Sequence, residues 1–417
     1  MLRCMLMPCL ALSLLSPLLV PQEPAASLKA LDTSGNSVPG LLASFDAEAA
    51  SFVVEGRQQR LPWASLLWLR PNKGKPGQGA PLRLDLVSGG RLSARIIGGD
   101  EGGESFDIEM PVLGSRRLAI DLVQSIRVQV DGRVQAPERI RPSGDALREI
   151  FYRRIATGLD PVPGYLEGAS NKGLLFQWTG AKEPKLYPWA EFGGLWLGED
   201  AEARQAASKP MLRVVLSDDS VLRGRPKSFD GSTLILDGGD LGELRVPGKD
   251  CLFIHVEHPA SRLPLSELSP KKVVERSFFG ADAPVHWPWR RDRPVRDPSL
   301  LHNETLVTAG QVYLRGLGVH SRSELSYVVP AGVKRFVTLV GIDDGALQLE
   351  RPGACEFRIL LDGQLVREHK ALRAGAAALL VDPLPVKPGQ ELRLVVDFGP
   401  AQHLGDRASW LEPCFVK

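Results

Sequence analysis

Residues 316–323 read GLGVHSRS, and this stretch decides the fold of the C-terminal part of the chain. Three further segments follow it: FVTLVGIDD at residues 336–344, FRILLDG at residues 357–363 and GDRASW at residues 405–410. Asp362 and Gly363 separate two apolar runs, and an Asp-Gly pair in that position is typical of a hairpin turn. The segments therefore predict strands joined by tight turns.

In their order and spacing, these four segments resemble the NPCBM/NEW2 family. That family is a carbohydrate-binding module found beside glycoside hydrolase family 98 domains and in many secreted bacterial proteins. The resemblance covers about residues 266–417. It implies a galactose-binding-like jelly-roll β-sandwich that recognises glycans and has no catalytic role.

Gly316 and Gly318 also invite comparison with a dinucleotide-binding loop. That fingerprint needs a third glycine where Ser321 stands, a strand before it and a helix after it. Residues 327–330 instead read YVVP, which favours a strand. The resemblance places the stretch at the start of a sandwich strand, where glycines allow close approach of the backbone.

Length and charge limit the possible functions. A chain of 417 residues predicts two to four domains. Lys and Arg number 51 against 49 Asp and Glu, so the net charge of +2 gives no basic field for nucleic acid. The 42 glycines and 33 prolines fit many turns between short strands.

The N-terminus resembles a secretory signal. Arg3 precedes an apolar run over residues 6–20 that is short for a membrane span. We expect a signal peptide over residues 1–26, no membrane span after its removal, and a secreted, periplasmic or cell-envelope protein. An uncleaved N-terminal anchor is the alternative.

Three cysteines, Cys251, Cys355 and Cys414, remain beyond that segment. Their number and spacing fit neither a disulfide framework nor a zinc site. Buried free thiols are expected, and pairing of Cys355 with Cys414 stays open.

Upstream of residue 258 the sequence repeats itself. The shared segments of a first kind of unit, A, are VPG at 38–40 and 162–164, PWA at 62–64 and 188–190, and LWL at 67–69 and 195–197. A second kind, B, is shared by residues 82–95 and 212–225. Apolar and polar residues alternate in both, which is the period of half-buried strands.

This order predicts a duplicated A-B-A-B arrangement, with one pair over residues 27–135, a second over 136–258, and the sandwich over 259–417. Each unit has room for about five short strands, and a small SH3- or Sm-like barrel closes such a sheet without free edges. We expect the whole chain to be all-β, and each A unit to share a core with the B unit that follows it.

Four residues are candidates for sugar contact: His320, Arg322, Trp287 and Asp406. They lie in or beside the motifs and supply an aromatic face and polar groups, which sugars require. His320 is either a donor to a sugar hydroxyl or a packing residue. Residues 286–293 read HWPWRRDR, which suits sugar stacking or packing at the junction with the barrels. Single-stranded nucleic acid is disfavoured by the neutral charge.

Other motifs have simpler explanations. Asp343 and Asp344 are expected at a strand-end turn, with structural calcium possible but no cofactor expected. His255 and His258 have the spacing of metal ligands but lack further ligands nearby in sequence. Trp410 is expected in the core. No GxSxG, HExxH, Walker or CxxC pattern occurs, so the sequence predicts no enzyme.

The sequence therefore predicts an exported, non-catalytic protein that binds a glycan or polysaccharide. One alternative is a structural or protein-interaction component of the envelope, with protein partners there and no sugar binding. Another is an accessory part of a glycoside hydrolase system, or an enzyme whose site lies between the barrels.

Overall fold

The computed structural model describes residues 28–70, 77, 79–100, 102–130, 133–135, 149–197, 209–280, 287–295, 301–303, 305–400 and 402–417. The signal segment predicted over residues 1–26 and His286 lie outside them. In this part of the chain the regular elements are strands and short 3-10 turns, so the prediction of an all-β protein is confirmed. No helix among these residues is long and apolar enough to cross a membrane.

The first A unit has five strands and one 3-10 turn. They are β1 (Leu28–Asp32), β2 (Ser37–Phe45), β3 (Ala49–Val54), β4 (Arg57–Pro62), η1 (Trp63–Ser65) and β5 (Leu66–Arg70). Consecutive strands pair antiparallel from β1 to β4, and β5 pairs with β1. The order within the unit is therefore 5-1-2-3-4, with the 3-10 turn joining the fourth strand to the fifth.

The other three units have the same order of pairing. The first B unit comprises β6 (Leu82–Leu86), β7 (Arg91–Gly99), β8 (Ser105–Met110), β9 (Gly114–Ala119), η2 (Ile120–Leu122) and β10 (Val123–Val130). The second A unit comprises β12 (Glu149–Ile155), β13 (Gly158–Ser170), β14 (Gly173–Trp178), β15 (Lys185–Pro188), η3 (Trp189–Glu191) and β16 (Phe192–Trp196). The second B unit comprises β17 (Met211–Leu216), β18 (Val221–Phe229), β19 (Thr233–Asp237), η4 (Gly239–Leu241), β20 (Glu243–Pro247), η5 (Gly248–Asp250) and β21 (Cys251–Glu257).

The structure corrects one alignment suggested by the sequence. The spacing between Trp63 and Trp189 continues without a gap into the next strand, so Leu69 is equivalent to Leu195 rather than to Leu197. The strand pairings agree, with Leu69 opposite Ala30 opposite Val38, and Leu195 opposite Phe151 opposite Val162. The two LWL segments are thus out of step by two residues, and Trp68 is equivalent to Gly194.

The spatial order of the units differs from their order in the chain. The fifth strand of the first A unit pairs with the fifth strand of the second B unit, with Leu69 opposite Ile254. The second A unit pairs in the same way with the first B unit, with Leu195 opposite Ile126. The strand pairing thus joins each A unit to the B unit of the other sequence pair. The expected shared core is a separate matter, because one apolar cluster contains residues of all four units.

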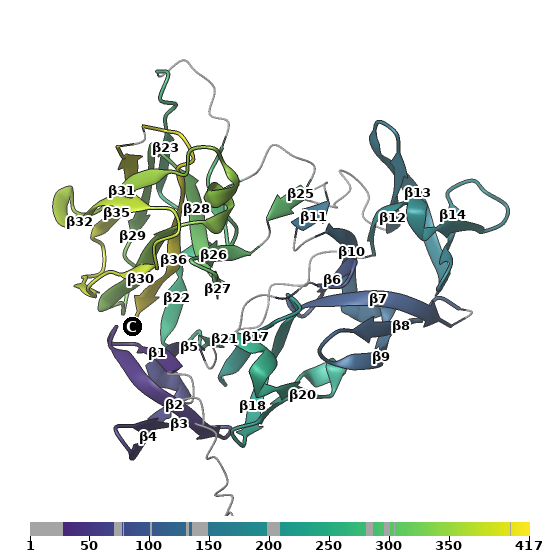
Figure 1. Cartoon of the computed structure of the whole chain (residues 1–417), viewed down its shortest axis with the longest axis horizontal. Coiled ribbons are helices and arrows are strands. Elements are labelled where there is room, and N and C mark those ends of the chain that lie inside the picture. Colours follow the sequence, from purple (N-terminus) through teal and green to yellow (C-terminus); the bar gives the residue numbers. More distant parts are fainter. Residues whose placement is uncertain are drawn as a thin grey trace, which may run out of the picture.

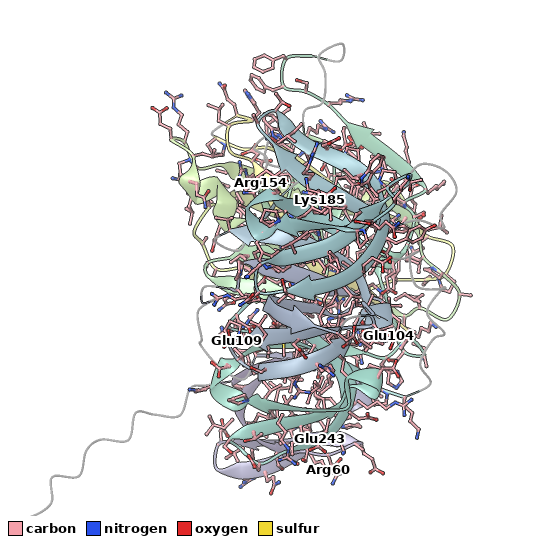
Figure 2. The ribbon with its side chains drawn as sticks, turned by 90° about the vertical axis from the view of Figure 1, so that its right-hand side faces the viewer. Arg60, Glu104, Glu109, Arg154, Lys185 and Glu243 are labelled. Atoms are coloured by element: carbon pink, nitrogen blue, oxygen red, sulfur yellow. The ribbon has the colours of Figure 1, made fainter. Side chains whose placement is uncertain are left out.

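The two B units meet in the centre of this N-terminal region, residues 28–257, where Arg91 of β7 lies opposite Val221 of β18. These two residues hold the same position in their units. The pair therefore marks an approximate twofold relation between two halves, one formed by the first A and second B units and the other by the second A and first B units. Figure 2 shows the resulting stack, from Arg60 of the first A unit through Glu243, Glu109 and Glu104 to Arg154 and Lys185 of the second A unit.

The C-terminal module, residues 262–417, consists mainly of two antiparallel sheets. One contains β24 (Arg290–Arg291), β28 (Gly316–His320), β36 (Arg407–Val416), β30 (Arg335–Ile342) and β33 (Leu379–Leu380), with β22 (Arg262–Pro264) and β34 (Leu384–Pro385) at its sides. The other contains β23 (Lys272–Glu275), β29 (Ser323–Val328), β35 (Glu391–Phe398), β31 (Ala354–Leu361) and β32 (Gln364–Arg373). The 3-10 turns η6 (Leu265–Glu267) and η7 (Asp344–Gln348) and the hairpin β26 (Leu306–Thr308) and β27 (Gln311–Tyr313) complete it.

One apolar core lies between these sheets, and Trp410 is fully buried in it with its ring edge-on to Phe357. The prediction that Trp410 is a core residue is confirmed. A Cβ atom on Gly318 would lie 2.1 Å from the carbonyl oxygen of Arg293, so this strand needs the glycine for close approach, as expected. Cys251, Cys355 and Cys414 are all buried and unpaired.

The apolar contact between the module and the N-terminal region lies on the half formed by the first A and second B units. A second apolar cluster joins Trp68 and Phe253 of the first A and second B units to Tyr313 and Leu411 of the module. Figure 1 shows the module above β1 and β5, with β22 leading into it. A further contact joins β11 (Arg133–Gln135) to β25 (Leu301–Asn303).

Candidate functional site

A small hollow of about 70 Å³ lies in the surface of the module. Four separate segments form it, because β23 pairs with β29 and so brings the residues after β23 next to the turn between β28 and β29. Its lining residues are Glu275, Arg276, Ser277, Phe278, Phe279, Trp287, His320, Ser321, Arg322 and His403. Of the four candidates, Trp287, His320 and Arg322 line this hollow and Asp406 does not.

Trp287 and His320 form one aromatic wall. Their rings stack with centroids 4.5 Å apart and an angle of 20° between their planes. The sequence placed both among the candidates, but only the fold brings them into contact.

A second aromatic wall was missed by the sequence analysis. Phe278 stacks on His403 with centroids 4.7 Å apart, and Phe279 meets the same histidine edge-on at 4.9 Å. The Phe279 side chain is 76% exposed, which is unusual for a large apolar residue outside a contact surface. Two adjacent phenylalanines before Gly280, in a turn, were the available signal.

The hydrogen bond of His320 determines which of its ring nitrogens can accept. Its Nδ1 lies 2.7 Å from the carbonyl oxygen of Ser321, and a carbonyl can only accept, so Nδ1 carries the hydrogen. Burial lowers the pKa of His320 to about 4, so the ring is neutral at physiological pH. Nε2 is then the nitrogen with a free lone pair. In this state the ring can accept from a hydroxyl at Nε2 but has no free N–H to donate, and its contact with a sugar stays a prediction.

Glu275 provides another acceptor that the sequence analysis missed. Its Oε1 accepts a hydrogen bond of 2.6 Å from the backbone N–H of Trp289, and burial raises its pKa. A carboxylate at the last residue of β23 can accept from ligand hydroxyls while remaining tied to the backbone.

Arg322 lines the hollow with its guanidinium held by two acids. Nη2 lies 2.8 Å from Glu324 and Nη1 lies 3.6 Å from Asp397. Its backbone pairs with that of Arg276 in both directions, at 3.3 and 3.0 Å. Arg276 is exposed at the same hollow, so cationic donors stand beside the acceptors.

Asp406 lies behind the hollow and is fully buried. Its Oδ2 accepts a hydrogen bond of 2.5 Å from Oγ of Ser321, and its Oδ1 accepts one of 3.2 Å from the N–H of Ala354. Burial raises the pKa of Asp406 to about 6. The side chain therefore reaches the hollow only through Ser321.

The acids considered for calcium bind backbone instead. Asp343 caps η7, its carboxylate accepting from the N–H groups of Gly345 and Val307 at 2.9 and 3.0 Å. Asp344 accepts from the N–H groups of Ala309 and Gly310 at 2.8 and 2.7 Å. Among the described residues, no group of three or more His, Cys, Asp or Glu side chains is placed to hold a metal ion.

A larger hollow, of about 580 Å³, is lined by residues of both B units. Leu92, Ile108, Met110, Leu118 and Leu244 give it a largely apolar lining. Of its charged residues, Asp100 accepts from the N–H groups of Glu104 and Ser105, and Arg117 pairs with Asp107. An enzyme site between the N-terminal units, the alternative left open by the sequence, would lie in a hollow of this kind. Two of its charged residues, Asp100 and Arg117, already have partners nearby.

Residues 266–416 match the family model of the NPCBM/NEW2 domain. The C-terminal module has the NPCBM/NEW2 pattern. The resemblance found in the sequence is therefore confirmed, and the match supports a carbohydrate-binding module, a non-catalytic class of domain. The aromatic hollow lies within the matched residues.

Solved structures similar to the chain include carbohydrate-binding modules of family 51. One is the second such module of Clostridium perfringens ZmpB, in complex with GlcNAc and with its INT domains, at 21% identity and a TM-score of 0.31. That match covers 44% of this chain and 36% of that chain, so this chain spans about a third of its length. Another is the module from Clostridium perfringens GH95 in complex with methyl-galactose, at 21% identity and a TM-score of 0.30, covering 37% of this chain and 99% of that chain.

Tandem family 51 modules of the family 98 glycoside hydrolase of Streptococcus pneumoniae are a third, at 13% identity and a TM-score of 0.31. They cover 88% of this chain and 99% of that chain. No curated protein matches the chain.

Proposed function

We propose that this chain is an exported, non-catalytic glycan-binding protein whose sugar site is the aromatic hollow of the NPCBM/NEW2 module. The observation that carries the proposal is the meeting of two aromatic walls with polar groups in one hollow within the matched residues. Sugars offer apolar C–H faces and polar hydroxyls, so they need both kinds of group.

In this proposal the exposed ring of Phe279 and the Trp287–His320 wall contact the C–H faces of the sugar. His320 and Glu275 accept from its hydroxyls, and Arg276 donates. The affinity of one site is expected to be weak, because each hydroxyl exchanges a bond to water for a bond to protein.

The N-terminal region would serve as a rigid base for this module. We propose that its four units are small SH3- or Sm-like barrels that arose by duplication, over residues 27–135 and 136–258, followed by the module over 259–417. The shared 5-1-2-3-4 strand order and the 3-10 turn before each fifth strand support this. Export rests on the Arg3 and leucine-rich start, and detection of an intact Met1 in mature protein by mass spectrometry would overturn it.

A glycan array probed with the whole chain tests the function. Titration calorimetry with methyl galactoside and N-acetylglucosamine, the sugars bound in the two clostridial structures, gives a quantitative complement. We expect Trp287→Ala and Phe279→Ala each to weaken binding about fivefold or more. The matched control is Trp178→Ala, which removes a 48% exposed tryptophan from the second A unit and should leave binding unchanged. If no glycan binds, or if Trp178→Ala alone abolishes binding, the hollow is not the sugar site.

A further inference from the structure

We propose that Asp406 is a positioning residue: acting through Ser321, it holds His320 as a hydrogen-bond acceptor, so that the hollow selects sugars that donate a hydroxyl hydrogen to this ring. The selectivity rests on the proposed function. The positioning itself can be measured without any sugar.

The first step is the contact between Asp406 and Ser321. Both are buried, at 0% and 4% exposure, and Oγ of Ser321 donates to Oδ2 of Asp406 at 2.5 Å. The other carboxylate oxygen is fixed by the N–H of Ala354 at 3.2 Å, on β31. A charge-assisted bond from a fixed acceptor therefore determines where residue 321 lies.

The second step leads from Ser321 to the ring. The carbonyl oxygen of Ser321 accepts from Nδ1 of His320 at 2.7 Å, and the ring plane is fixed by its stacking on Trp287. A hydrogen bond at one ring nitrogen sets the state of the other. With Nδ1 protonated in a neutral ring, Nε2 is left as an acceptor, and the lowered pKa of His320 agrees with this state.

The third step concerns the ligand. A site that offers an acceptor to a hydroxyl rejects analogues without that hydroxyl, because its polar group is then buried unpaired. Glu275, the other acceptor of the hollow, has the same preference. The chemical class that fits is a neutral sugar with free hydroxyls. A sugar carrying a carboxylate or methyl ether at this position would face a lone pair with no hydrogen to give.

The test reads the histidine ring directly. In whole protein labelled with ¹⁵N-histidine, long-range ¹H–¹⁵N spectra distinguish a ring protonated at Nδ1 from one protonated at Nε2, and His320→Gln assigns the signal. We expect the Nδ1-protonated form at pH 7. Ser321→Ala, which breaks the link to Asp406, should give a mixture of the two forms, and Asp406→Asn should shift the same signal.

Ser323→Ala is the matched control. Ser323 is two residues away and equally buried, and its hydroxyl has no hydrogen-bond partner, so its removal should leave the spectrum unchanged. With methyl galactoside as the probe, we expect Ser321→Ala to raise Kd about five- to tenfold and Ser323→Ala to leave it unchanged.

The two proposals fail in different ways. An Nε2-protonated or charged ring in the wild type, or a Ser321→Ala spectrum identical to that of the wild type, would overturn the positioning role. A spectrum that behaves as expected in a protein that binds no glycan would retain the positioning role and overturn the sugar function.

Discussion

The two halves of the N-terminal region share one pairing but present different faces. In both, the fifth strand of an A unit joins the fifth strand of a B unit in the same register, at Leu69–Ile254 and at Leu195–Ile126. Beside these pairs, Trp68 in the first half corresponds to Gly194 in the second. Phe253 likewise corresponds to Ser125.

The apolar contact with the module lies on the half that has the rings, whereas the other half meets the module through the pairing of β11 with β25. The ring centroids of Trp68 and Phe253 lie 5.8 Å apart, and those of Phe253 and Tyr313 of the module lie 5.9 Å apart. The other half instead carries a charged cluster, in which Asp85 binds Arg127 at 2.7 Å and Arg83 at 2.8 Å. On a shared strand frame, the apolar contact with the module thus coincides with the half that carries the rings.

The charges of the two halves are satisfied differently. Arg70 of the first half is surrounded by the rings of Trp68, Phe253 and Tyr313, and donates to Gln311 Oε1 at 2.9 Å and to the carbonyl oxygen of Val312 at 3.1 Å. Burial alone would raise the pKa of Asp85 in the second half. Arg127 and Arg83 outweigh that effect and lower it.

The largest effect on stability should come from removing the ring of Trp68, which the second half lacks because Gly194 stands at the equivalent position. Trp68→Ala removes a ring that is 4% exposed between the N-terminal region and the module, so the free energy of unfolding should fall by about 3–5 kcal/mol. Urea denaturation measures this, and the exposed Trp178→Ala is the control, with a change below about 0.5 kcal/mol. Equal losses in the two variants would show that the ring does not hold the module.

Arg70 gives the next effect in size. Arg70→Met keeps an apolar stem but loses the contacts with three rings and two hydrogen bonds across the interface, at an expected cost of about 2–3 kcal/mol. Arg70→Lys keeps the charge without the planar group, so its stability should lie between those of the wild type and Arg70→Met. Thermal unfolding compares the three proteins, and a lysine variant as stable as the wild type would contradict the role of the guanidinium.

The stability of the module and that of the second half should depend on pH in opposite ways. Asp406 and Asp343 each have a pKa raised by burial from 3.8 to about 6. Because protonation favours their folded state, this stabilisation is complete below about pH 4 and lost as the pH rises through 6. The pKa of Asp85 is lowered, so its contribution is present above pH 4 and lost in more acidic solution.

Hydrogen exchange, corrected for the intrinsic rate at each pH, can measure this by segment. Protection of β30 and β36 should increase from pH 7.5 to 5.5 by on the order of 1–2 kcal/mol. Protection of β6 and β10 should decrease only below pH 4. Parallel changes in both segments would show that the buried acids do not act locally.

The smallest effect should come from exposed ion pairs. Lys227 and Glu243 lie 2.7 Å apart in the second B unit, but their side chains are 50% and 38% exposed. Lys227→Ala should change the free energy of unfolding by less than about 0.5 kcal/mol, and 1 M salt should remove the difference. A change above about 1 kcal/mol would mean that outer charges matter as much as the interface.

The sequence was sufficient for features that depend on local pattern. Alternation of apolar and polar residues predicted the strands, and Asp362-Gly363 does join β31 to β32. The order of the C-terminal segments identified the module. Trp287, His320 and Arg322, chosen because they lie in or next to those segments, line one hollow, and their contact with a sugar stays a prediction.

Tertiary structure alone decided which distant segments meet. The pairing of the first A unit with the second B unit depends on edge strands, whose backbone groups can join any free edge and leave no local signal. The hollow combines residues 275–279, 287, 320–322 and 403, which only the sheet register brings together. Asp406 lies in a motif of its own, GDRASW, and the fold buries it behind Ser321, where its carboxylate accepts from Oγ of Ser321 and from the N–H of Ala354.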